Sequence, residues 1–193
     1  MSSFSYSALI LSGGQGQRMG GLDKGWVSWR GKPLIEHALD RVVRQTLAPA
    51  EILVSANRHR DRYALTGACV VSDVRQGFAG PLAGIEAGLL HARHEWVLVT
   101  TCDMPLIPLN LAQKLHAGLT GQQVALAFVG QNLSPLTILM SRFLLKSLSA
   151  YLDAGQAAVK PWLQSLNGAV VEFEEPESFR NINTLKETDD NAT

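Results

Sequence analysis

Cysteine is scarce in this sequence of 193 residues, which contains only two. Cys69 and Cys102 lie far apart in apolar surroundings, and they form no CxxC pair. The sequence therefore offers no disulfide framework, and a reducing cytoplasm is the expected location. We expect Cys102 to pack beside Asp103 rather than to act as a redox or catalytic thiol.

The sequence also lacks an excess of charge of either sign and a long apolar run. Lys and Arg together number 17, as do Asp and Glu, so the formal net charge is zero. A neutral chain has no general attraction for nucleic acid or for an anionic membrane, and local groups must hold any anion that it binds. No apolar run approaches the roughly 20 residues that span a bilayer. Residues 1–7 lack the basic and apolar regions of a signal peptide, so we expect neither a nucleic-acid partner nor a membrane.

The composition that is present suits one globular domain, expected to span residues 1–193. Hydrophobic residues make up 46% of the chain and charged residues 18%, which is ordinary for a folded protein. Short apolar runs predict strands at residues 6–11, 51–56, 69–72, 96–101, 124–129, 135–140 and 169–173. Helices are predicted with Pro33 or Pro81 in the first turn, after Pro108 to about residue 119, at 142–152 and at 160–166. The helix from Pro81 is expected to bury Leu82, Ile85, Leu89 and Leu90.

Alternating strands and helices predict a three-layer, Rossmann-like α/β fold, in which helices cover both faces of a mostly parallel sheet. Ligands bind outside the carboxyl ends of the strands in such sheets. Four polar residues lie at the ends of the first four predicted strands: Ser12, Ser55, Asp73 and Asp103. We therefore expect all four to face one crevice.

Residues 12–24 form a Gly-rich segment directly after the first predicted strand. The segment holds five glycines together with Arg18 and Lys24. Glycines allow backbone N–H groups to turn toward a phosphate, and the two cations can bind its oxygens. The alternative is a surface loop with solvated cations. The segment fits neither a P-loop, because Leu22 stands where the lysine must be, nor a GxGxxG fingerprint, because Met19 replaces the third glycine.

This segment resembles the signature LxGGxxxRMGxxDK of nucleotidyltransferases with the nucleotide-diphospho-sugar transferase fold. Within that group the chain is most similar to the bacterial molybdenum cofactor guanylyltransferase family. Matches at compatible spacing continue over almost the whole sequence, at residues 31–34, 56–58, 73, 80–84, 102–105 and 181–184. The resemblance implies a nucleotide-binding first half and an acceptor-binding second half.

The implied reaction is attack by the terminal phosphate of molybdopterin on the α-phosphorus of GTP, which releases pyrophosphate and yields a guanine dinucleotide form of the cofactor. A phosphate nucleophile is already anionic at neutral pH, so positioning and charge stabilisation can carry the catalysis. The resemblance assigns catalysis to Arg18, Lys24 and Asp103, with Asp103 as the Mg²⁺ ligand. The nucleotide contacts that it implies are Leu11, Ser12, Gly13, Gly14, Lys24, Ser55, Asp73 and Asp103.

Some of these residues also have a simpler structural interpretation. A carboxylate at a strand end can bind Mg²⁺; the alternative is that Asp103 caps a helix or forms a turn before Pro105. Asp73 could begin a turn. Asp23 is interpreted as a residue that fixes the loop by pairing with a nearby cation.

The second half of the chain is expected to hold the pterin. Asn181 and Asn183 would point the same way on an extended segment, where their amides suit a pterin edge; a polar turn is the alternative. Ser134 stands where a His is common in the family, and Ala157 and Ala158 occupy a stretch that is often basic.

The partners implied by the resemblance are GTP, molybdopterin, molybdenum-insertion proteins and molybdoenzyme chaperones, and the chain is expected to act as a monomer. Gly13 and Gly14 match the guanine-using members. The alternatives are a nucleotidyltransferase acting on CTP or on a sugar or polyol phosphate, and a non-catalytic nucleotide-binding module. The last of these predicts loss of Arg18, Lys24 or Asp103, and all three are present.

Overall fold

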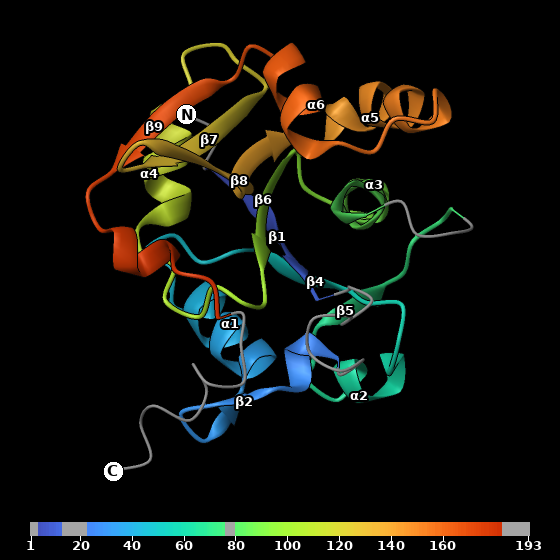
Figure 1. Ribbon diagram of the computed structural model, residues 1–193, viewed down its shortest axis with the longest axis vertical. Helices are drawn as coiled ribbons and strands as arrows, with labels where there is room; N and C mark the ends of the chain where they lie inside the picture. The colour runs from blue at the N-terminus through green and yellow to red at the C-terminus, as the bar shows by residue number, and fades with distance from the viewer. Residues whose placement is uncertain (1–3, 13–22, 76–79, 183–193) are drawn as a thin grey trace.

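The computed structural model describes residues 4–12, 23–75 and 80–182. Among these residues the main sheet has seven strands, in the order β5-β4-β1-β6-β8-β7-β9 (Figure 1). β8 runs antiparallel to its neighbours β6 and β7, and the other pairings are parallel. The predicted mostly parallel sheet is confirmed. The strands are β1 (Tyr6–Leu11), β4 (Glu51–Ser55), β5 (Cys69–Val71), β6 (Trp96–Thr101), β7 (Val124–Val129), β8 (Asn132–Ser141) and β9 (Ala169–Phe173).

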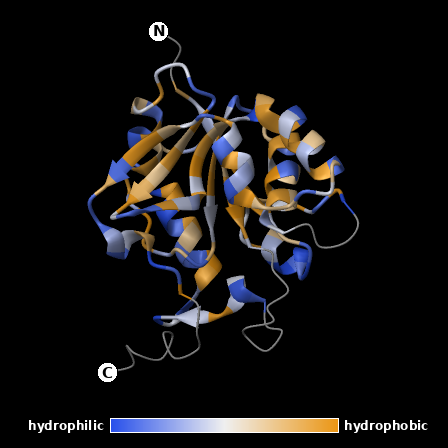
Figure 2. Ribbon diagram, turned by 45° about the horizontal axis from the view of Figure 1, so that its top comes forward, coloured by the Kyte–Doolittle hydropathy of each residue, from blue (hydrophilic) through white to orange (hydrophobic). Residues whose placement is uncertain are grey.

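Helices cover both faces of this sheet, which gives the predicted three layers (Figure 1). One face carries α1 (Leu34–Val43), α2 (Arg60–Ala64) and α4 (Leu111–Ala117), and the other carries α3 (Pro81–His91), α5 (Leu145–Asp153) and α6 (Val159–Ser165). Figure 2 shows apolar strands between helices whose outer faces are largely polar. No helix in the described part of the chain is both long and apolar enough to cross a membrane.

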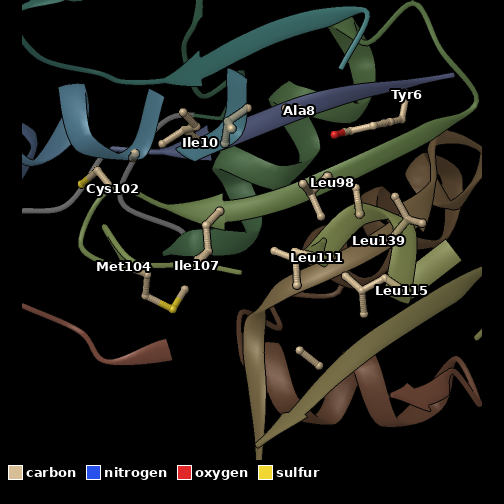
Figure 3. Close-up of a cluster of buried hydrophobic side chains, with 14 of the residues drawn as sticks. Tyr6, Ala8, Ile10, Leu98, Cys102, Met104, Ile107, Leu111, Leu115 and Leu139 are labelled. Carbon is tan, nitrogen blue, oxygen red and sulfur yellow. The ribbon is translucent and has the colours of Figure 1, made fainter. Parts of the chain in front are cut away.

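The core lies on both sides of β1, because successive side chains of a strand point to opposite faces. Tyr6, Ala8 and Ile10 join the core beneath α1 and α4 (Figure 3), whereas Leu9 and Leu11 join the core beneath α3. Every residue of β1 is buried. Burial on both faces explains why this strand is a continuous apolar run instead of an alternating one.

Two glycines let α3 lie close against the sheet. A Cβ added at Gly88 would lie 2.2 Å from Cδ2 of Leu9, and one added at Gly84 would lie 2.6 Å from Oγ of Ser55. Both distances are shorter than real carbon contacts allow. α3 therefore needs glycine at these positions to pack as close to the sheet as it does.

The order of the strands places a topological switch point between β1 and β6. The strands β4 and β5 continue the sheet on one side of β1, and α3 then leads the chain back to β6 on the other side. Ligand sites in open α/β sheets form at such a point, at the carboxyl ends of the strands. The segment 12–24 begins here, directly after β1.

A small hairpin that the sequence did not predict precedes α1. It consists of β2 (Ser28–Trp29) and β3 (Lys32–Pro33), and Arg30 and Gly31 at its turn have φ angles of 48° and 77°. Pro33 pairs with Ser28 and is extended, so α1 begins one residue later, at Leu34. The placement of Pro33 in the first helical turn was therefore wrong. Short 3-10 helices occur at η2 (Lys24–Trp26), η3 (Arg142–Leu144) and η4 (Pro176–Phe179).

Most other predicted bounds agree with the structure. The helix α2 was not predicted, because five residues are too few to show a helical period. Leu90 was expected on the buried face of α3 but is 52% exposed. α3 is buried continuously from Leu82 to Leu89 between the sheet and α5, and Leu90 lies beyond the end of that contact.

Candidate active site

Backbone hydrogen bonds join the ends of three neighbouring strands at the switch point. The Ser12 N–H donates to the carbonyl of Ser55 over 2.9 Å, and the Cys102 N–H donates to the carbonyl of Leu11 over 3.1 Å. These bonds extend the β1–β4 and β1–β6 ladders one step beyond β1. They bring the first residue of the Gly-rich segment, the end of β4 and the residue before Asp103 together.

Asp103 and Lys24 form an ion pair at this edge of the sheet. The Lys24 Nζ lies 2.5 Å from Oδ2 of Asp103, and the side chains are 26% and 16% exposed. The Thr101 hydroxyl donates to the other carboxylate oxygen of Asp103. Asp103 lies in a turn, as one interpretation of the sequence expected, and it caps no helix in the described residues. Its carboxylate nevertheless holds a cation that comes from the other end of the Gly-rich segment.

Asp23 is fixed by groups that the sequence analysis did not identify. Its Oδ1 accepts a hydrogen bond of 2.6 Å from the Tyr63 phenol and one of 3.3 Å from the Gly25 N–H. Its Oδ2 lies 3.0 Å from Nδ1 of His59. Among the described residues, Asp23 is thus held by a phenol, a backbone amide and an imidazole, and the imidazole forms the expected ion pair when it is protonated.

Tyr63 also contacts Ser12, at the opposite end of the Gly-rich segment. The Ser12 hydroxyl donates to the Tyr63 phenol oxygen over 2.9 Å. The Tyr63 side chain is fully buried, and its ring lies against that of Trp26 with 4.9 Å between centroids. Burial, and the carboxylate of Asp23, raise the pKa of Tyr63 well above its ordinary value. The phenol therefore keeps its proton and can donate at any physiological pH.

The two other predicted strand-end residues lie nearby but outside this network. Ser55 contributes its carbonyl to Ser12, while its side chain faces Gly84 of α3 and the residue is 3% exposed. Asp73 follows β5 at the same edge of the sheet and pairs with Asn57, whose amide donates to Oδ2 of Asp73 over 2.8 Å. The Asp73 N–H in turn donates to Oδ1 of Asn57. Direct nucleotide contacts of Ser55 and Asp73 remain predictions.

The C-terminal segment returns to the same edge. The Ile182 N–H donates to the backbone carbonyl of Asp103 over 2.8 Å, and Ile182 is buried beside Trp29 and Leu106. Asn181 is exposed immediately before it. The structure therefore places Ile182, and with it the backbone next to Asn181, beside Asp103; a contact of Asn181 with the acceptor stays a prediction.

The other residues that the sequence analysis considered for the acceptor half are more dispersed. The Ser134 hydroxyl lies 2.9 Å from that of Thr137 on β8, and the Thr137 hydroxyl lies 3.5 Å from the sulfur of Met104. These contacts link β8 to the segment that carries Asp103. Ala157 and Ala158 precede α6, where the Ala158 carbonyl accepts a hydrogen bond from Tyr151.

Cys102 behaves as the sequence predicted. It is 3% exposed and packs in the core close to Ile10 (Figure 3). Burial raises its pKa to about 12. The thiol is therefore neutral at physiological pH, which does not suit a nucleophile or a redox centre.

Several predicted site residues lie outside the described residues, namely Gly13, Gly14, Arg18 and Asn183. Their assignments stay predictions from the sequence. The sequence analysis missed three residues that hold Asp23 or Asp103 in place, namely Tyr63, His59 and Thr101. Only Thr101 had an available signal, because a hydroxyl two residues before a strand-end carboxylate can reach it.

Comparisons with known proteins agree on one family. A family model described as "MobA-like NTP transferase domain" matches residues 8–170. The chain is 40% identical over 183 residues to the "Molybdenum cofactor guanylyltransferase" of Shewanella putrefaciens, covering 93% of this chain and 92% of that protein. It is 39% identical over 180 residues to the protein of the same name from Shewanella loihica, covering 92% and 90%.

Solved structures with low sequence identity share the fold. The "Molybdopterin-guanine dinucleotide biosynthesis protein A" of Archaeoglobus fulgidus has a TM-score of 0.74 at 23% identity and covers 94% of both chains. The "4-diphosphocytidyl-2C-methyl-D-erythritolsynthase" of Anaerococcus prevotii has a TM-score of 0.71 at 15% identity, covering 95% of this chain and 92% of that one. The fold is therefore shared by proteins whose names differ in nucleotide and acceptor.

Proposed function

Because the chain belongs to the molybdenum cofactor guanylyltransferase family, with its MobA-like NTP transferase domain, we propose that it transfers GMP from GTP to the terminal phosphate of molybdenum-molybdopterin. The products are a guanine dinucleotide form of the cofactor and pyrophosphate. The observation that carries this proposal is the Lys24–Asp103 pair, with 2.5 Å between Nζ and Oδ2, at the carboxyl end of β6 beside the start of the Gly-rich segment.

The carboxylate of Asp103 is suited to bind Mg²⁺. No group of three or more His, Cys, Asp or Glu residues in the described ranges could form a metal cage. Mg²⁺ bound with a nucleotide does not need one, because one or two carboxylates, water and the substrate phosphates complete its coordination. The Asp103 carboxylate is an acidic group at this edge that remains partly exposed. Held by Asp103, a bound Mg²⁺ would supply positive charge that offsets the negative charge developing on the phosphate oxygens.

The residues of the chain act by positioning and by charge. Lys24 and Arg18 supply cations for the triphosphate, and the N–H groups of the Gly-rich segment, with Gly13 and Gly14, supply donors. The α-phosphorus must face the acceptor phosphate for an in-line displacement, in which the new P–O bond forms as the bond to pyrophosphate breaks. No general base is required, because the attacking phosphate is already ionised.

The acceptor site is proposed to lie across Asp103 from the nucleotide. Asn181 stands one residue before the Ile182 N–H that bonds to Asp103, and Asn183 follows it. The amides of these two residues can donate to and accept from a pterin edge. Ser134 and Thr137 approach the same region through Met104.

The finer expectations stay predictions of the family resemblance. They are docking of molybdenum-insertion proteins and of molybdoenzyme chaperones, action as a monomer in the cytoplasm, and preference for guanine over cytosine. The preference rests on Gly13 and Gly14, since the shared fold also occurs in the diphosphocytidyl synthase described above.

The experiment that tests the function is incubation with Mg²⁺ and each nucleoside triphosphate, with and without molybdopterin. Dinucleotide product and pyrophosphate are measured, and reactions without Mg²⁺ serve as controls. We expect product from GTP only when molybdopterin and Mg²⁺ are both present. Faster turnover of CTP would overturn the guanine assignment, and turnover of a sugar phosphate but not of molybdopterin would overturn the acceptor assignment.

A further inference from the structure

We propose that Tyr63 is a positioning residue for nucleotide binding: its phenol ties Ser12, at the end of β1, to Asp23, the residue before Lys24. The proposal rests on the proposed function of Lys24 and Asp103 in binding Mg²⁺-GTP. Tyr63 does not itself need to contact the nucleotide. Its hydroxyl accepts from Ser12, the residue before the segment 13–22, and donates to Asp23, the residue after it.

The two hydrogen bonds make one short bridge. The distances are 2.9 Å from the Ser12 Oγ to the phenol oxygen and 2.6 Å from the phenol oxygen to Oδ1 of Asp23. Ser12 is also tied to β4 through its backbone, and the Asp23 side chain is only 8% exposed. Both anchor points are therefore fixed to the sheet and to α2.

The space around the phenol supports a specific role for its hydroxyl. A Cβ added at Gly25 would lie 2.3 Å from the Tyr63 oxygen and 2.4 Å from the Ser12 Oγ. Gly25 has an ordinary negative φ, so glycine is needed here for space. Residue 25 can carry no side chain without displacing this bridge.

The bridge also reaches the ion pair at the centre of the site. Asp23 immediately precedes Lys24, and its carboxylate caps the first residues of η2 through the Gly25 N–H. Holding Asp23 therefore holds the backbone from which Lys24 extends to Asp103. Holding Lys24 in place before the ligand arrives lowers the conformational freedom that binding removes.

Removal of the Tyr63 hydroxyl should weaken GTP binding more than it lowers the turnover rate of the enzyme saturated with GTP. Tyr63→Phe keeps the ring against Trp26 and deletes only the bridge. A site in which Lys24 is in place for a smaller fraction of the time binds GTP with lower apparent affinity, but saturating GTP restores the competent state. We expect the Kd and KM of GTP to rise about tenfold and kcat to fall less than about threefold.

Tyr6→Phe is the matched control. The Tyr6 phenol is also buried, and it donates a hydrogen bond of 2.6 Å to the carbonyl of Leu47. It lies at the start of β1, at the opposite edge of the sheet from the site. The two variants should lose similar melting temperature, but the control should bind GTP within about twofold of wild type.

The experiment is a calorimetric titration of each full-length protein with Mg²⁺-GTP, together with steady-state kinetics and a melting curve. Ser12→Ala provides a second route, since it deletes the same bridge from its other end. We expect Ser12→Ala and Tyr63→Phe to weaken binding similarly, and the double variant to be little worse than either alone. This pattern, with a wild-type-like control, would support the proposal.

Three outcomes would overturn it. A wild-type Kd in Tyr63→Phe would overturn the inference alone, as would equal weakening in Tyr6→Phe, which would indicate a general loosening of the fold. Additive effects of Ser12→Ala and Tyr63→Phe would show that the two groups do not act as one bridge. Failure of the wild-type protein to bind GTP would overturn the proposed function, and this inference with it.

Discussion

The ammonium group of Lys24 lies 2.5 Å from the carboxylate of Asp103, although 79 positions separate the two residues in the sequence. The parallel pairing of β1 with β6 makes the contact possible, because the segment after β1 and the turn after β6 emerge at the same edge of the sheet. The pair places a cation and a possible metal ligand side by side. A triphosphate with its metal needs both in one place.

Replacement of Lys24 by Met should remove the cation and keep most of the side-chain length. We expect kcat/KM for GTP to fall by about 100-fold, since a charge aimed at a transferring phosphate is a major part of transition-state stabilisation. Steady-state pyrophosphate release measures this. Lys32→Met is the control, because Lys32 forms an exposed ion pair with Asp40 over 2.9 Å. Equal losses in both variants would contradict a specific role for Lys24.

Glu51 should make the stability of the protein depend on pH. Burial alone would raise the pKa of this carboxyl, but the Arg93 N–H and guanidinium and the Ser7 hydroxyl lower it to about 2. Because the Glu51 pKa is lower in the folded than in the unfolded state, the ionised carboxylate stabilises the fold above about pH 4.5. This stabilisation is lost as the pH falls toward 2. At neutral pH it amounts to roughly 3 kcal/mol at most.

Denaturant unfolding of Glu51→Gln at several pH values tests that dependence. The free energy of unfolding of the variant should be lower than that of wild type at pH 7, and the difference should shrink between about pH 5 and pH 2. Glu177→Gln is the control, because the Glu177 side chain is 85% exposed. A constant difference between wild type and Glu51→Gln across this range would refute the assignment.

Arg75 joins the segment after β5 to α3 and α5. Its guanidinium donates two hydrogen bonds of 2.7 Å to Glu86, whose side chain is 5% exposed, and one of 2.7 Å to Asp153. Arg75→Ala would leave the Glu86 carboxylate buried without its cation, so we expect a loss of about 3 kcal/mol in the free energy of unfolding. Asp153→Asn should cost less than about 1 kcal/mol, because Asp153 is 68% exposed. Urea unfolding of both variants measures the contrast, and equal costs would contradict it.

Gly88 should tolerate no side chain. A methyl group there would meet the side chain of Leu9 at 2.2 Å, and Leu9 is fully buried, so any shift of its side chain would disturb the core around it. We therefore expect Gly88→Ala to destabilise the fold by about 1 to 3 kcal/mol in spite of the higher helix propensity of Ala. Leu90→Ala in the same helix should change stability by less than about 0.5 kcal/mol, since Leu90 is 52% exposed. Thermal unfolding distinguishes the two, and a more stable Gly88→Ala variant would refute the packing argument.

The sequence predicted the sheet and the location of Ser12, Ser55, Asp73 and Asp103 at the carboxyl ends of its strands, because both follow from general rules of parallel strands; that all four face one crevice stays a prediction. Apolar runs mark buried strands, and the carboxyl ends of those strands share an edge. These rules do not give distances along the edge. Asp73 accordingly reaches the expected edge but pairs with Asn57, two residues beyond the end of β4.

The contacts of Tyr63 could not be predicted in the same way. In the sequence it is an aromatic residue in a polar stretch, and its short helix shows no period. Only the folded structure shows that its hydroxyl lies between Ser12 and Asp23. No local sequence rule predicts that these two residues lie close together. The hairpin β2–β3 was missed for a similar reason, since two-residue strands carry no alternation.

The central claim is that guanylyl transfer takes place at the Lys24–Asp103 pair, and the rate of dinucleotide formation by Asp103→Asn tests it most directly. Asparagine keeps the shape of the side chain and removes the charge that would bind Mg²⁺. With GTP, Mg²⁺ and molybdopterin, we expect this variant to lose about 100-fold or more of kcat while its melting temperature stays close to that of wild type. Asp40→Asn, at the exposed pair with Lys32, should form product at the wild-type rate. Wild-type product formation by Asp103→Asn would contradict the account.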